Sequence, residues 1–152
     1  MTTRQAVCDE ARRWLRTPYH HAARLHGVGV DCAMLPLEVY SGVGAIPGAD
    51  PEHYPRDWHL HRSEERYLEW VDKFAFRIGE KPQGTQDVIG KPPGLGDFVI
   101  WRWGRTFSHG AIHVGDGMVI HAVLGLGVTQ DDMWQHQELR TRAALFYSVW
   151  ED

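Results

Sequence analysis

Hydrophobic residues recur at helical spacing in the first part of the chain. Up to about Leu15, apolar side chains return every three or four positions, and Thr2 or Thr3 can cap a helix there. A second apolar segment covers residues 32–40, and its Pro36 is tolerated only within the first turn of a helix. The pattern therefore predicts one amphipathic helix ending near Leu15 and one mostly buried helix over 32–40.

Two irregular connections flank a third helical pattern. Residues 41–55 are rich in glycine and proline, which predicts a loop. From about Asp57 or Ser63 to Phe76, apolar and acidic residues are interleaved at helical spacing and predict a helix. Glycines and prolines return between residues 79 and 96, so we expect a second long connection there.

After Gly96 the pattern changes from helix to strand, because β-branched and aromatic residues now dominate. Asp116-Gly117 is a strong hairpin signal, which pairs the segments on either side of it. The predicted strands are 97–103, 108–114, 118–123, 127–130 and 143–150. Helices followed by an antiparallel sheet predict an α+β fold, which we expect to form one domain over residues 1–152.

Composition and charge narrow the classes of function. Apolar residues make up 43% of the chain, enough for a packed core without metal or disulfide support. A formal net charge of −4 and scattered lysines and arginines argue against nucleic acid as a partner. Residues 1–16 lack the apolar core of a signal peptide, and no apolar run approaches the roughly 20 residues of a membrane span. We therefore expect synthesis in a cytoplasm, without membrane insertion.

One cysteine lies in a setting that favours chemistry. Glycines at 27 and 29 precede Asp31 and Cys32, at the point where a helix is predicted to begin. Unpaired backbone N–H groups and the macrodipole at a helix start favour a thiolate over a thiol. We interpret Cys32 as a nucleophile. Cys8 falls within the first amphipathic helix and is interpreted as a small packing residue, and both cysteines are expected to be reduced.

A nucleophilic thiol needs a base, and three histidines in the predicted strands are candidates. His109 and His113 are four positions apart in a predicted strand, so their side chains point to the same face of the sheet. The hairpin brings His121 onto the neighbouring strand. A Cys–His pair works when one imidazole nitrogen faces sulfur and a third group holds the other nitrogen. His109 and His121 fit these two roles, whereas His113 is interpreted as a packing or hydrogen-bonding residue. Trp101 and Trp103 are candidates for lining a groove.

The chain has ten histidines, which raises the alternative of a zinc site. The residues that would bind the metal are His20, His21 and His26, or His59 and His61. Structural zinc sites usually include cysteines at short spacing, and the chain has no C-x-x-C motif. We therefore expect no metal.

Five segments of the chain follow one another in a characteristic order. They are Thr17-Pro18-Tyr19, Gly29-Val30-Asp31-Cys32, Gly96-Asp97-Phe98-Val99-Ile100-Trp101, Ser108-His109-Gly110-Ala111-Ile112-His113-Val114-Gly115-Asp116-Gly117 and Ile120-His121-Ala122. Together they resemble the motifs of NlpC-type cell-wall cysteine peptidases. The resemblance implies a papain-like α+β fold, with N-terminal helices packed on a C-terminal antiparallel sheet.

The same resemblance implies an enzyme that hydrolyses amide bonds in bacterial peptidoglycan stem peptides, commonly between D-glutamate and a diamino acid. Cys32 would be the nucleophile, His109 the general base and then the general acid, and His121 the residue that orients His109. The family needs no metal and no cofactor.

The resemblance also assigns residues to the substrate site. Tyr19, Asp31 and Ser108 would line it, and Asp31 would meet a free amino group of the stem peptide. Asp31 is equally suited to cap the following helix. The family usually has serine and glycine after its cysteine, where this chain has Ala33 and Met34, so a hydroxyl contact to substrate is expected to be missing.

Residues 45–91 form a long segment between the cysteine and the histidines and are interpreted as a family-variable insertion. It could cover or narrow the cleft as a lid, or only support the fold as a buttress. Compact versions without a wall-binding module resemble bacteriophage tail-associated peptidases, which makes tail proteins candidate partners and the virion tail a candidate location. Two other functions stay open: a tail structural or assembly protein with a weak or vestigial peptidase site, and an acyltransferase on the same scaffold.

Overall fold

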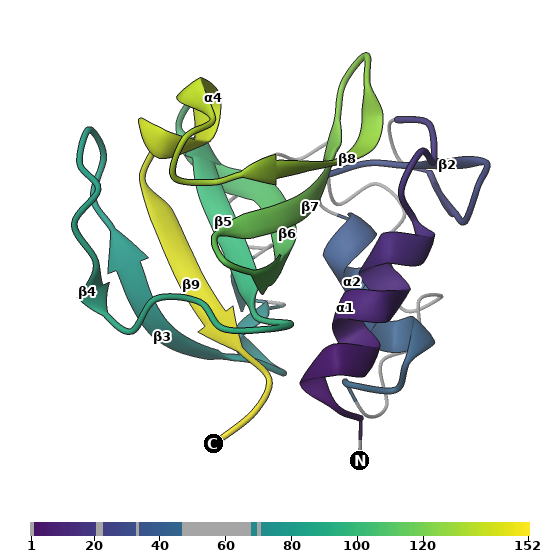
Figure 1. Cartoon of the computed structure of the whole chain (residues 1–152), viewed down its shortest axis with the longest axis horizontal. Helices are drawn as coiled ribbons and strands as arrows, with labels where there is room; N and C mark the ends of the chain where they lie inside the picture. Colours follow the sequence, from purple (N-terminus) through teal and green to yellow (C-terminus); the bar gives the residue numbers. More distant parts are fainter. Residues whose placement is uncertain (1, 21–22, 33, 47–67, 70) are drawn as a thin grey trace.

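The described structure is a computed structural model that covers residues 2–20, 23–32, 34–46, 68–69 and 71–152. Its elements are α1 (Arg4–Arg13), β1 (Arg24–Leu25), β2 (Gly29–Val30), α2 (Met34–Gly42), β3 (Phe76–Lys81), β4 (Ile89–Gly90), β5 (Phe98–Trp103), β6 (Thr106–Gly115), β7 (Met118–Val123), β8 (Gly127–Asp132), α4 (Gln137–Arg140) and β9 (Ala144–Ser148). The two longer helices come first and most of the strands later, which confirms the predicted α+β class (Figure 1).

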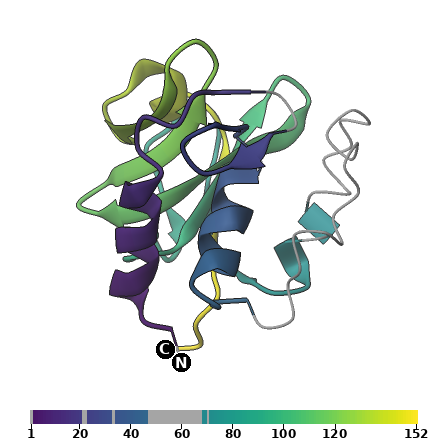
Figure 2. The ribbon, with the colours of Figure 1, turned by 90° about the vertical axis from the view of Figure 1, so that its right-hand side faces the viewer.

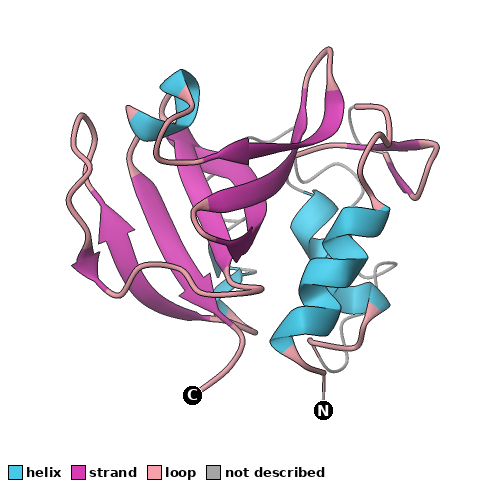
Figure 3. Cartoon of the chain, in the orientation of Figure 1, coloured by secondary structure: helices cyan, strands magenta, loops and turns pink. Residues whose placement is uncertain are grey.

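Seven strands form one sheet in the order β4-β3-β9-β5-β6-β7-β8, and every pairing is antiparallel. The helices α1 and α2 lie side by side against one face of this sheet (Figures 1 and 2). The short helix α4 lies apart from them, over the sheet (Figure 3). Within the described residues, no helix has the length and apolar character that crossing a bilayer requires.

Helix α1 begins with the predicted threonine cap. The Thr3 hydroxyl accepts a hydrogen bond from the Ala6 N–H at 3.1 Å. This satisfies one of the unpaired donors at the start of the helix. The helix ends at Arg13, two residues before the predicted end at Leu15. Its buried face includes Cys8, whose thiol points to the His113 carbonyl at 3.8 Å, and Cys8 and Cys32 are not joined by a disulfide.

Helix α2 follows a carboxylate cap. Asp31 Oδ1 accepts the Met34 N–H at 2.9 Å, and the Asp31 carbonyl accepts the Leu35 N–H at 3.1 Å. The helix therefore starts at Met34 rather than at the predicted Cys32, because the residues from Asp31 onward form the capping turn. Pro36 lies in the first turn, where a missing N–H costs nothing, and the helix is mostly buried as predicted.

The central strands are buried on both faces. One hydrophobic cluster lies between the helices and the sheet, and its strand residues include Phe98, Ile100, Ile112 and Ile120. A second cluster lies on the opposite face, and its members are Val99, Trp101, Ala111, Val119, Met133, Leu139, Ala144 and Phe146. Two buried faces explain the nearly continuous apolar run of β5. The prediction that Trp101 lines a groove is wrong, because its side chain is fully buried in the second cluster.

The hairpin between β6 and β7 forms at the predicted turn. Asp116 and Gly117 have φ angles of 54° and 78°, the left-handed conformation that this two-residue turn needs at both positions. Beyond the turn, His113 pairs with Val119 and Ile112 with Ile120. The strands predicted near 127–130 and 143–150 are also present, as β8 and β9.

The prediction of an irregular connection over residues 79–96 is wrong in part. Strand β3 pairs with both β4 and β9 and thus belongs to the main sheet. Its side chains gave no strand signal, because exposure does not alternate regularly along it and Gly79 interrupts it. Gly79 is required by close backbone packing, since a Cβ atom there would lie 2.2 Å from the Lys91 carbonyl oxygen.

The described residues at the C-terminal end of the expected insertion over residues 45–91 are integrated into the fold. Val71, Ala75 and Lys81 are buried, and β3 is a strand of the common sheet. The helix predicted to reach Phe76 ends earlier, because Phe76 is the first residue of β3. Residues 47–67 and 70, which include the start of that predicted helix, lie outside the described residues.

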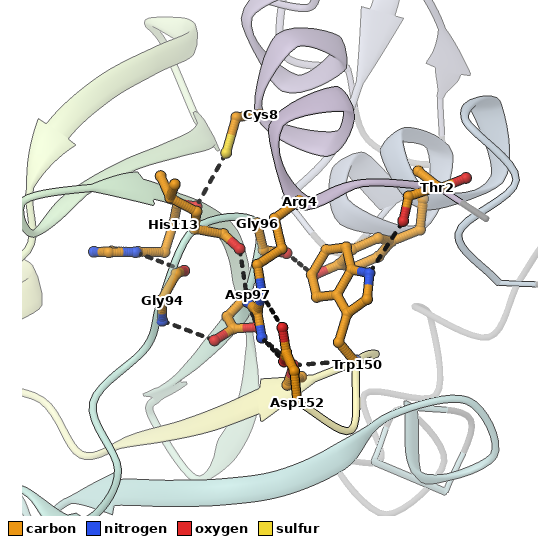
Figure 4. A network of polar contacts seen from close by, with 12 residues as sticks. Thr2, Arg4, Cys8, Gly94, Gly96, Asp97, His113, Trp150 and Asp152 are labelled. Atoms are coloured by element: carbon orange, nitrogen blue, oxygen red, sulfur yellow. Dashed lines mark hydrogen bonds and ion pairs between the residues drawn. The ribbon is translucent and has the colours of Figure 1, made fainter.

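A polar network joins α1 to the loop before β5 and to the end of the chain (Figure 4). The Arg4 guanidinium contacts Asp97 at 2.8 Å and Asp152 at 2.6 Å, and it lies 4.5 Å from the Trp150 ring centre. The Trp150 indole N–H donates to the Thr2 carbonyl at 3.2 Å. We call these five residues the Arg4 network. It closes the edge of the structure at which the two ends meet (Figure 2).

Candidate active site

Cys32 lies where the capping turn of α2 meets strand β6. Its Sγ is 3.7 Å from the Ser108 carbonyl oxygen, and Ser108 directly precedes His109. The Ser108 hydroxyl in turn is 3.3 Å from the Thr106 hydroxyl. The thiol from the helical part of the sequence and the strand that carries His109 are thus in contact, although 76 residues separate Cys32 from Ser108.

The loop before Cys32 brings Tyr19 to it. Tyr19 and Val30 form a short parallel bridge, fixed by hydrogen bonds from the His20 N–H to the Val30 carbonyl at 3.2 Å and from the Val30 N–H to the Pro18 carbonyl at 3.1 Å. This bridge places Tyr19 close to Cys32, two residues after Val30.

The Tyr19 hydroxyl is neutral and in contact with Cys32. Burial raises the pKa of this hydroxyl well above its ordinary value, and negative charge on Cys32 or Asp31 raises the pKa further. Its hydrogen bond to the Cys32 side chain also raises the pKa, whereas its hydrogen bond to the Cys32 backbone lowers it. Tyr19 therefore retains its proton at neutral pH and can donate a hydrogen bond beside the sulfur.

His109 and His121 are directly hydrogen-bonded. Nε2 of His109 is 2.8 Å from Nδ1 of His121, and the rings meet edge to face with centroids 5.1 Å apart. The indole of Trp103 stacks on His109 at 4.7 Å, and Trp101 lies 5.9 Å away. Because Nε2 is engaged with His121, Nδ1 is the nitrogen of His109 that is available for a thiol.

Asp131 extends this pair and was missed by the sequence reasoning. Its Oδ2 lies 2.7 Å from Nε2 of His121. The predicted strand ended at Gln130, two residues before the end of β8 at Asp132, so Asp131 was left outside the sheet. The signal that could have found it is an acidic residue two positions beyond Thr129, which is the cross-strand partner of His121.

Both histidines are uncharged at neutral pH. Burial lowers the pKa of His109 well below its ordinary value, and the neighbouring His121, Arg142 and His136 lower it further. Burial also lowers the pKa of His121, although Asp131 opposes this effect. Two neutral imidazoles can form a hydrogen bond in which one ring donates and the other accepts.

Trp103 is held against His109 by a cation. The Arg142 guanidinium lies 3.7 Å from the Trp103 ring centre, and its Nη2 contacts Glu138 at 2.9 Å. Trp103 is 38% exposed, so one part of its ring stacks on His109 while another part faces solvent. Trp103 is thus partly accessible to solvent, whereas Trp101 is fully buried.

Asp31 and His113 have structural contacts. Asp31 is 3% exposed, and one of its oxygens caps α2. His113 accepts the Gly117 N–H at Nε2 (3.1 Å), so its Nδ1 carries the proton and donates to the Gly94 carbonyl at 2.8 Å. His113 is thus the hydrogen-bonding residue that was expected. Ala33 lies outside the described residues.

The histidines considered for zinc do not form a common cluster in the part of the chain that is described. His26 is hydrogen-bonded to the Arg13 carbonyl at 2.6 Å. His21, His59 and His61 lie outside the described residues. No group of three metal-ligating side chains occurs among the residues that the structure describes.

Helices packed on an antiparallel sheet, with a cysteine at a helix start in contact with a histidine-bearing strand, define a papain-like α+β protein. The model of the NlpC/P60 family matches residues 16–143, and the chain belongs to this family. The five sequence motifs therefore identified the family correctly.

Solved structures with the same fold have low sequence identity to this chain. The NlpC/p60 domain of the peptidoglycan hydrolase SagA is 21% identical with a TM-score of 0.58, and the match covers 95% of this chain and 98% of that domain. An NlpC/P60 family protein from Bacillus cereus ATCC 10987 is 16% identical with a TM-score of 0.61, over 95% of this chain and 39% of the other. A lipoprotein-like NLP/P60 family protein from Staphylococcus aureus subsp. aureus Mu50 is 17% identical with a TM-score of 0.58, over 98% and 42%. A comparison with curated proteins gives no match.

Proposed function

We propose that this protein is a cysteine peptidase that hydrolyses amide bonds in peptidoglycan stem peptides. The observation that carries the proposal is the contact between the Cys32 thiol and the strand of His109, at 3.7 Å from the Ser108 carbonyl. Membership of the NlpC/P60 family and the fold shared with a peptidoglycan hydrolase domain support the choice of substrate.

In the first half of the reaction, Nδ1 of His109 accepts the Cys32 proton as sulfur attacks the scissile carbonyl carbon. A C–S bond forms, and the carbonyl oxygen becomes an oxyanion. The protonated Tyr19 hydroxyl is in contact with Cys32 and can donate a hydrogen bond to this developing charge. Positive charge on His109 is shared through its hydrogen bond to His121.

In the second half, the His109 imidazolium protonates the leaving amine and the C–N bond breaks. This leaves a thioester on Cys32. Neutral His109 then removes a proton from water as the water oxygen attacks the thioester carbon. The C–S bond breaks, the carboxylic acid is released, and His109 returns its proton to the Cys32 sulfur. His109 must be neutral before it accepts the Cys32 proton and again before it removes a proton from water, and the lowered pKa of buried His109 meets that requirement.

Asp31 is the proposed recognition group for a free substrate amine, although its burial and its bond to the Met34 N–H favour the capping role. The contact between the Cys32 thiol and the Ser108 carbonyl supports the assignment of Ser108 to the substrate site. Delivery by a phage tail stays a prediction from the sequence resemblance.

The decisive test is digestion of defined muropeptides, analysed by mass spectrometry. We expect Cys32→Ala to abolish cleavage without unfolding the protein. Cys8→Ala is the matched control: Cys8 is fully buried, and we expect this variant to retain cleavage. Undiminished cleavage by Cys32→Ala protein would refute the proposal.

Thiol labelling separates an active site from a vestigial one. In the folded protein, iodoacetamide should modify Cys32 rapidly, with an apparent pKa below the usual value of about 8.5, while buried Cys8 stays unmodified. Slow labelling with an ordinary pKa would favour an assembly protein. An amine added to the digestion distinguishes a peptidase from an acyltransferase. Hydrolysis by a peptidase yields the free acid, whereas acyl transfer to the added amine yields a new amide.

A further inference from the structure

Two hydrogen bonds run in series from β6 across β7 to β8. Nε2 of His109 is 2.8 Å from Nδ1 of His121, and Nε2 of His121 is 2.7 Å from Oδ2 of Asp131. His121 and Asp131 are diagonal neighbours, because His121 pairs with Thr129, two residues before Asp131. The three side chains form one polar row that ends on β8, the edge strand of the sheet.

The carboxylate determines which nitrogen carries each proton. A carboxylate accepts hydrogen bonds and donates none, so Nε2 of His121 carries a proton. In the neutral ring, Nδ1 of His121 then has a free lone pair, which accepts the N–H of His109 Nε2. Nδ1 of neutral His109 is consequently unprotonated. This is the nitrogen that must receive the proton of a thiol.

We propose that Asp131 is a positioning residue of the peptidase site, which selects through His121 the tautomer of His109 that can act as a base. The kinetic consequence rests on the proposed function of Cys32 and His109, but the tautomer itself does not. Asp131 acts only through His121.

The charges around the pair agree with this role. The Asp131 carboxylate raises the pKa of His121 against the effect of burial, so it stabilises positive charge that reaches His121 from His109. His136, 6.3 Å from His121 between ring centres, and Arg142 act in the opposite direction and lower the pKa of the pair.

The expected size of the effect follows from exposure. The Asp131 side chain is 29% exposed, so water can replace part of its hydrogen bond when it is removed. Loss of a fully buried orienting carboxylate in a catalytic triad costs a factor of about 10⁴, whereas partners outside the first layer of a site typically cost about 10- to 100-fold. We expect the second range for Asp131→Ala.

The test combines histidine NMR with kinetics on the full chain. Two-bond ¹H–¹⁵N spectra at pH 7.5 distinguish a proton on Nε2 from one on Nδ1, and His109→Gln and His121→Gln variants assign the two rings. In the parent protein, both rings should carry the proton on Nε2. Asp131→Ala should mix the tautomers of both rings and lower kcat/KM on muropeptides by about 10- to 100-fold.

Two further variants exclude a merely structural effect. Asp131→Asn keeps an oxygen that can accept the His121 N–H, so it should restore the Nε2–H tautomers and most of the activity. Gln130→Ala changes an exposed residue of the same strand on the other face and should leave both readouts unchanged.

A proton on Nδ1 of His109 in the parent protein would overturn the proposal, as would unaltered tautomers and kcat/KM in Asp131→Ala protein. If instead cleavage does not require Cys32, the proposed function fails while the NMR spectra still decide the role of Asp131.

Discussion

The Arg4 network allows a quantitative test of how the ends of the structure are held. We predict that Arg4→Met lowers the free energy of unfolding by about 3 kcal/mol. Asp97 is only 3% exposed, and the change leaves its Oδ1 without the guanidinium at 2.8 Å. Breaking a fully buried pair costs about 3–5 kcal/mol, but the Arg4 side chain is 27% exposed, so water recovers part of this and about 2–3 kcal/mol remains. Loss of the cation–π contact with Trp150 adds about 0.5–1 kcal/mol.

Urea denaturation at pH 7 measures this loss, and Asp152→Ala is its matched control. Asp152 also contacts Arg4, at 2.6 Å, but its side chain is 65% exposed, so we expect no measurable change in the midpoint. In the Arg4→Met background, Asp97→Asn should lower the free energy of unfolding less than it does in the parent protein. The reason is that Asp97→Asn then removes a buried charge that has already lost its Arg4 partner. Equal midpoint shifts for Arg4→Met and Asp152→Ala would refute the reasoning.

Two further predictions concern buried titratable groups. The pKa values of buried His109, His113 and His121 are all lowered, so the unfolded chain binds protons more readily, and stability falls as the pH drops below about 6.5. Urea denaturation at pH 7.5 and 5.0 should show this loss, at most about 1.4 kcal/mol per pH unit for each histidine, and equal stability would contradict neutral burial. The buried Lys81 amine donates to three backbone carbonyls at 3.2, 2.9 and 2.6 Å, so Lys81→Met should cost about 2 kcal/mol in the same assay. Lys73→Met, at an exposed position, is its control, and an equally small effect of both changes would show that desolvation cancels the three bonds.

Local signals made much of the fold predictable. The Thr3 cap, Pro36 near a helix start and the Asp116-Gly117 turn each require a particular backbone conformation, so their consequences could be predicted without tertiary information. The hairpin then placed His121 on the strand next to His109. The proximity of Cys32 to the strand of His109 came from the family resemblance, because no local rule brings residues 76 positions apart, such as Cys32 and Ser108, into contact.

The parts that were missed depend on long-range pairing. Strand β3 is held by backbone hydrogen bonds to β9, about 65 residues later in the chain. Buried and exposed side chains do not alternate regularly along β3. The short helix α4 has no side-chain cap at its start, so it offered no local signal. Asp131 reaches His121 through the register of β7 with β8, which the sequence pattern left undefined.

The position of β9 in the sheet has a consequence for the order of folding. The strand that comes last in the sequence inserts between β3 and β5, and it is the only strand paired with both within the described residues. During synthesis, β5 to β8 can assemble through neighbouring hairpins, while β3 and β4 can pair only with each other. The two halves of the sheet are therefore joined only after Ala144–Ser148 has left the ribosome, so the nascent chain must keep the open edges of β3 and β5 from pairing with other strands until then.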